Sequence, residues 1–63
     1  MKTVVKHSSS KFAWNVINTA LGGKYLIAVI PYIGVDIDDE NEPQRIEALE
    51  HAKYISDALN AAF

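Results

Sequence analysis

Residues 12–32, FAWNVINTALGGKYLIAVIPY, contain two apolar runs on either side of the glycine pair Gly22-Gly23. Aromatic and β-branched residues dominate both runs, a composition that favours extended strands. Glycine adopts positive φ without steric cost, so the pair predicts a four-residue turn over 20–23. We therefore expect an antiparallel β-hairpin with strands over 12–19 and 24–32.

The second run of the hairpin is apolar at odd and even positions alike, from Tyr25 to Ile30. Successive side chains of a strand point to opposite faces, so both faces of this strand are apolar. Such strands are normally covered on both sides, and we expect this one to be central or covered. Pro31 has no N–H to donate and predicts the strand's end or an edge position.

Two shorter segments extend the predicted sheet. Val4 and Val5 lie at the centre of a candidate strand over residues 2–6. Ile33, Val35 and Ile37 alternate with smaller or charged residues, which is typical of a half-buried strand. The sheet is thus expected to have three to four strands.

Residues 43–62 predict one helix. At about 100° per residue, an alanine-rich stripe faces the sheet, flanked by His51, Ala58 and Phe63. The stripe consists of Ala48, Ala52, Ile55, Leu59 and Ala62. Pro43 suits the first turn, and Asn41 with Gln44 resembles a capping box. A weaker second stripe, Ile46, Tyr54 and Ala61, is a candidate oligomer interface.

The fold class follows from these elements. We expect an α+β fold, a small antiparallel sheet with one C-terminal helix packed on it. A single domain spans residues 1–63, with the sheet over about 2–38 and the helix over about 43–62. At this length a core seldom contributes more than about 3–5 kcal/mol. Because the chain has no cysteine for disulfides, we expect self-association into a homodimer or a larger assembly, with the second helix stripe or an exposed sheet edge as the contact.

Composition also excludes several classes of protein. A two-domain enzyme does not fit in 63 residues. The longest fully apolar run, residues 26–31, is far shorter than the roughly 20 residues of a membrane span. The first ten residues lack the apolar middle of a signal peptide. We therefore expect a cytoplasmic protein that does not bind membranes.

Charge is segregated along the chain. Residues 1–32 carry four lysines and no acid, whereas residues 33–63 carry eight acids against Arg45 and Lys53. The basic half also contains aromatic rings, which is typical of nucleotide and single-strand binding. Its candidate ligand or partner residues are Lys11, Trp14, Lys24 and Tyr25. Trp14 fits a core position as well as a binding platform. We expect no duplex DNA binding, since no helix is basic enough to enter a groove.

Other chemical motifs are incomplete. Asp36, Asp38, Glu40 and Glu47 have calcium-loop spacing, but Asn41 stands where that loop needs glycine. The Gly-Gly-Lys at 22–24 lacks the remaining P-loop residues and is interpreted as a turn. Serines 8–10 and the two histidines, His7 and His51, form no recognisable catalytic arrangement. We expect no enzymatic activity, no metal and no cofactor.

Five segments follow one another in a definite order along the chain. They are His7, Phe12-Ala13-Trp14-Asn15-Val16, Leu26-Ile27-Ala28-Val29, the acidic residues 36–42 and the helical segment 51–59. Over residues 7–62 the chain resembles short phage- and prophage-encoded proteins of unknown function. It departs from them at 8–11, which lacks their Pro-Gly-Pro, and at Ser56-Asp57, where they have small residues. The resemblance implies a phage accessory gene and assigns no site residues.

Size, segregated charge and this resemblance favour a non-enzymatic binding protein. We expect a phage accessory factor in the bacterial host's cytoplasm that inhibits a host process, such as a defence system, by stoichiometric binding of a host protein. Two alternatives stay open. An oligomer could sequester a small anionic ligand, a nucleotide signal, in its basic aromatic half, or the chain could modulate nucleic acid or transcription.

Overall fold

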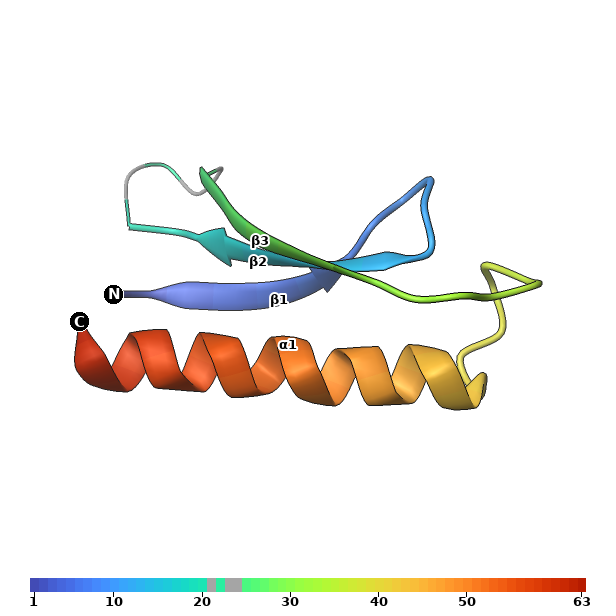
Figure 1. Ribbon diagram of the computed structural model, residues 1–63. Coiled ribbons are helices and arrows are strands. Elements are labelled where there is room, and N and C mark those ends of the chain that lie inside the picture. Colours follow the sequence, from blue (N-terminus) through green and yellow to red (C-terminus); the bar gives the residue numbers. More distant parts are fainter. Residues whose placement is uncertain (21, 23–24) are drawn as a thin grey trace.

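Three strands and one helix make up the fold of the computed structural model, which describes residues 1–20, 22 and 25–63. The strands β1 (Thr3–His7), β2 (Ala13–Asn18) and β3 (Tyr25–Pro31) form an antiparallel sheet in the order β1-β2-β3. The helix α1 (Pro43–Ala62) runs along one face of this sheet (Figure 1). The predicted α+β class and the helix bounds are confirmed.

The β2–β3 hairpin forms as predicted. Asn18 pairs with Tyr25 at the turn end, and Ala13 pairs with Pro31 at the other. Gly22 has a φ of +86°, the left-handed conformation for which glycine was expected. The rest of the predicted turn cannot be compared with the prediction at Leu21 and Gly23, which lie outside the described residues, as does Lys24.

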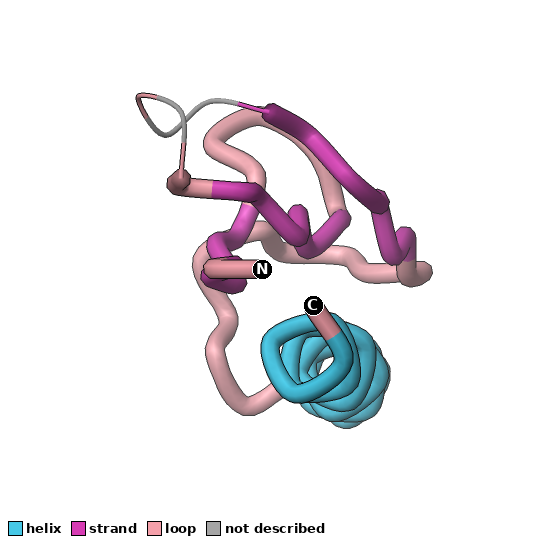
Figure 2. Tube along the Cα trace, turned by 90° about the vertical axis from the view of Figure 1, so that its left-hand side faces the viewer, coloured by secondary structure: helices cyan, strands magenta, loops and turns pink. Residues whose placement is uncertain are grey.

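Small side chains form the interface between sheet and helix. Val5, Val16 and Ala28 pair across the three strands on the helix-facing side, and Val16 is fully buried. Ala48 and Ala52 are buried on the helix. Because alanine has no side chain beyond Cβ, α1 lies close against the sheet, as the end-on view shows (Figure 2). As a consequence, the core contains little apolar volume.

Polar side chains close the interface at the end where both chain termini lie (Figure 1). The hydroxyls of buried Thr3 and Ser56 are hydrogen-bonded to each other. The Thr3 N–H and hydroxyl also donate to Asn60 Oδ1, at 2.7 and 2.9 Å. These bonds allow Ser56 to be buried, although the predicted apolar stripe omitted it. Ala62, Ala58, His51 and Phe63, placed in or beside that stripe, are exposed instead.

The prediction that β3 would be central or covered on both sides is wrong. β3 is an edge strand, and Leu26, Ile27 and Val29 are each exposed by 42–56%. Pro31, by contrast, ends an edge strand as its missing N–H predicted. The apolar residues that the pattern of β3 predicts to be covered are thus left exposed in one chain.

The predicted strand over 33–38 is also wrong. Residues 32–42 are irregular, and Ile33 and Val35 are 79% and 94% exposed. Asp36 Oδ1 accepts the N–H of Asp38, and this side-chain turn replaces a sheet ladder. The predicted capping box is absent as well, because Glu42 is the N-cap and makes no side-chain cap bond. Pro43 does occupy the first turn of α1.

Candidate binding surface

An aromatic cluster lies where β1 and β2 meet the turn between them. The rings of His7 and Trp14 meet edge to face at 4.8 Å, and Phe12 meets Tyr32 in the same way at 5.8 Å. His7 Nδ1 lies 2.6 Å from the carbonyl oxygen of Ser8, so this nitrogen carries a proton and donates. His7 Nε2 lies 2.7 Å from the Tyr32 hydroxyl. Both ring nitrogens of His7 therefore hold the fold together.

Trp14 is held between the sheet and the start of α1. Its indole N–H donates to the carbonyl oxygen of Arg45 at 3.0 Å. The Arg45 guanidinium lies 5.4 Å from the centre of the indole ring, and it also donates to the carbonyl oxygen of Ile37 at 2.7 Å. A half-buried ring with its polar atom satisfied serves as an internal anchor. Arg45 fixes the loop and the helix start, a role that sequence reasoning missed.

The structure does not bring the predicted ligand residues together. Lys11 is exposed in the β1–β2 turn, beside the end of β2 at Ala13. Tyr25 is 64% exposed and pairs with Asn18 at the opposite end of β2, about 17 Å along the strand. Trp14 points into the helix side, and Lys24 lies outside the described residues. Within one chain the three described residues, Lys11, Trp14 and Tyr25, line no common site.

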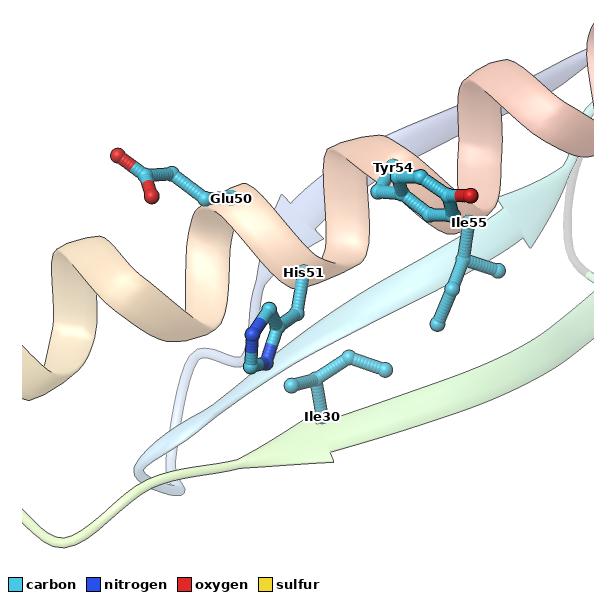
Figure 3. A pocket seen from close by; sticks show the side chains of 5 residues that line it. All are labelled: Ile30, Glu50, His51, Tyr54 and Ile55. Carbon is cyan, nitrogen blue, oxygen red and sulfur yellow. The ribbon is translucent and has the colours of Figure 1, made fainter.

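The predicted oligomer-contact residues separate onto different parts of α1. Tyr54 is 75% exposed and lines a hollow of about 580 Å³ together with Ile30, Glu50, His51 and Ile55. Figure 3 shows Ile30 of β3 and Ile55 of α1 pointing toward each other, while Glu50 points away. Ile46 instead borders a hollow with Trp14, Arg45 and Leu49, and Ala61 is exposed near the helix end.

An apolar patch covers the sheet face opposite the helix. Val4, Ile17 and Leu26 pair across all three strands on this outer face, and Val29 lies in the next row with Lys6 and Asn15. Val4, Leu26 and Val29 are 36%, 56% and 48% exposed. We call Val4, Ile17, Leu26 and Val29 the outer-face patch. The sequence signal for it was the two-sided apolar pattern of 25–30.

The remaining candidates have local structural roles. Asp36 and Asp39 accept backbone N–H groups two residues ahead, at 3.0 and 2.9 Å. The Ser8 hydroxyl accepts the N–H groups of Ser10 and Lys11 and so caps the β1–β2 turn. Within residues 1–20, 22 and 25–63, no three His, Cys, Asp or Glu side chains converge as metal ligands would. These groups stabilise turns.

Comparison of the chain with protein-family models, curated proteins and solved structures finds no match. No helix in the described part of the chain combines the length and apolar character needed to cross a membrane.

Proposed function

We propose that this chain is a non-enzymatic binding protein that acts stoichiometrically on a host protein, as a phage accessory factor. The outer-face patch is the observation that carries the proposal. Contiguous apolar side chains left exposed on a soluble domain are typical of protein-interaction surfaces. Here they occupy a rigid, hydrogen-bonded sheet rather than a loop.

The chemistry of the patch specifies the partner. Lys6 pairs with Asn15 in the row next to Val4 and Ile17, and Lys2 precedes the same strand. The patch is thus apolar at its centre and positively charged along the β1 side. A complementary partner presents an apolar surface bordered by carboxylates.

Binding, rather than catalysis, is what the titratable side chains support. Both ring nitrogens of His7 are engaged by Ser8 and Tyr32. The Ser8 hydroxyl is directed to backbone N–H groups of its own turn. A nucleophile and its base need to be within hydrogen-bond reach, and these groups are committed elsewhere. The phage assignment itself is supported by the residue resemblance over 7–62.

Affinity capture from a bacterial lysate tests the proposal. The immobilised chain is compared with Val4→Glu, which puts a carboxylate into the outer-face patch, and with Ile46→Glu. Ile46 is 44% exposed on α1, away from the patch, and is the matched control. Mass spectrometry then identifies retained proteins and small molecules.

We expect the chain and Ile46→Glu to retain the same protein in an equimolar amount, and Val4→Glu to lose it. A Val4→Glu variant with an unchanged circular dichroism spectrum shows that the loss is not due to unfolding. Retention of the same partner by Val4→Glu contradicts the proposal. Retention of a nucleotide in place of a protein contradicts it as well and favours ligand sequestration.

A further inference from the structure

We infer that two copies of this chain pair through the open edge of β3 into one continuous six-stranded sheet. The two β3 strands run antiparallel about a twofold axis, and both α1 helices lie on the same face. This self-association uses the edge of β3, and Leu26 and Val29 of that strand also belong to the outer-face patch. The two proposals are therefore told apart by Val4, which lies on β1, and by Tyr54, which lies on α1.

Hydrogen-bonding groups at the open edge of β3 are the first observation. The Tyr32 N–H donates to the carbonyl oxygen of Phe12, one residue beyond the Ala13–Pro31 pair. In an antiparallel ladder bonded and non-bonded pairs alternate, so Ile30 is bonded to β2 and Val29 is not. The N–H and C=O of Val29 therefore point away from β2. Pro31 also lies at an outward position, where its missing N–H breaks no bond to β2.

The β1 edge of the sheet is protected against pairing with another strand, so β3 is the edge at which a second copy pairs. On β1 the outward N–H of Thr3 is taken by Asn60 of the helix at 2.7 Å. Lys2 and Lys6 add charge to that strand, and lysine is a common guard of natural edge strands. Residues 25–35 contain no charged residue at all. β3 is thus the edge without a charged guard. Pro31 removes one donor only at the end of the strand, and residues 25–30 have the composition of a central strand.

The hollow beside β3 provides the second layer of contact. Ile30, Ile55 and Tyr54 line it along the open edge (Figure 3). With two β3 strands paired, this hollow lies next to its twofold copy, between the two α1 helices. Tyr54, 75% exposed in one chain, is then placed over the seam. Aromatic side chains at the centre of an interface contribute much of the binding energy.

The exposed area and the self-complementarity of an antiparallel strand pair favour a second copy as the occupant. The chain exposes 4491 Å², whereas a compact monomer of its mass exposes about 4,000 Å². Its buried apolar residues are only Ala13, Val16, Ala48 and Ala52 among those described. The molecule is 35 Å long, so a contact along its length has room for the roughly 1,000 Å² of a specific interface. In antiparallel pairing about a twofold axis, β3 of one copy can bond to the same edge of β3 in the other copy.

Sedimentation equilibrium of the full chain tests the inference. We expect twice the 7.0 kDa chain mass at micromolar concentration. Val29→Lys places two like charges across the seam, and we expect it to raise the dissociation constant by about tenfold or more. Tyr54→Lys removes the ring over the hollow, and we expect the dissociation constant of the dimer to rise by about tenfold.

Two control variants carry the new lysine at positions away from the proposed contact. Val35, 94% exposed in the loop, and Ile46, on the other side of α1, are each changed to lysine and should leave the dissociation constant within about twofold. A monomer at all concentrations overturns the inference. So does a dimer that Val29→Lys leaves intact or that Ile46→Lys disrupts. Binding of the host partner is read separately in the capture experiment, so each proposal fails by its own measurement.

Discussion

At the scale of single residues, hydrogen bonds decide which polar groups enter the interior. Thr3 and Ser56 are 6% and 5% exposed, because each hydroxyl has a partner in the other. Trp14 is similarly tied to Arg45. Sequence reasoning left the role of Trp14 open between core and platform, since the alternation of 12–17 fits both. The partner that settles it is 31 positions away and is joined to it only by the fold.

Thr3→Val is predicted to destabilise the fold. Valine keeps the shape of threonine but leaves the Ser56 hydroxyl without its partner and removes one bond to Asn60. An unpaired buried polar group costs about 1–3 kcal/mol. Urea unfolding at a fixed protein concentration measures the loss. Thr19→Val is the control, because its hydroxyl bonds Lys2 in an exposed position, and about 0.5 kcal/mol or less is expected. Equal losses in both variants would show that the buried cluster contributes nothing special.

At the scale of elements, local pattern predicted the hairpin and the helix bounds but not their environment. The turn glycine, the β-branched runs and Pro43 act within a few residues, and the structure follows them. Whether β3 is covered, and whether 33–38 forms a strand, depends on neighbouring elements that are distant in the sequence. Among the described residues, β3 has a neighbouring strand, β2, on one side only, and no strand pairs with 33–38. In the proposed dimer the β3 strand becomes central, as its two-sided apolar pattern predicts.

The loop after β3 is predicted to depend on the absence of a side chain at Gly34. A Cβ there would lie 2.6 Å from Cδ1 of Phe12, closer than carbon atoms approach. Gly34→Ala must displace the Phe12 ring from Tyr32, and overpacking of this kind costs about 1–3 kcal/mol. Unfolding of Gly34→Ala, Phe12→Leu and the double variant measures the coupling. We expect the alanine to cost less when Phe12 is already leucine; strict additivity would mean that the two residues do not touch.

At the scale of the whole molecule, one chain leaves much apolar surface and one strand edge unburied. Its helix-facing layer is thin, its outer face is apolar, and one of its two sheet edges carries no charged side chain. The charges are also unevenly distributed, since Lys2, Lys6 and Lys11 lie on or next to β1, whereas the acids lie in the loop and helix. A dimer through β3 leaves the lysine-bordered β1 sides at the two outer ends of a wider sheet. The proposed partner surface is thereby presented twice.

Amide hydrogen exchange of Val29, compared with that of Val5, tests the pairing of β3 most directly. Both are strand valines whose N–H groups point away from β2, at the uncharged edge of β3 and at the lysine-guarded edge of β1 respectively. We predict that protection of the Val29 amide rises with protein concentration as β3 pairs with its copy, while the Val5 amide exchanges fast throughout. Fast exchange of Val29 at every concentration, or concentration-dependent protection of Val5 instead, would contradict the account.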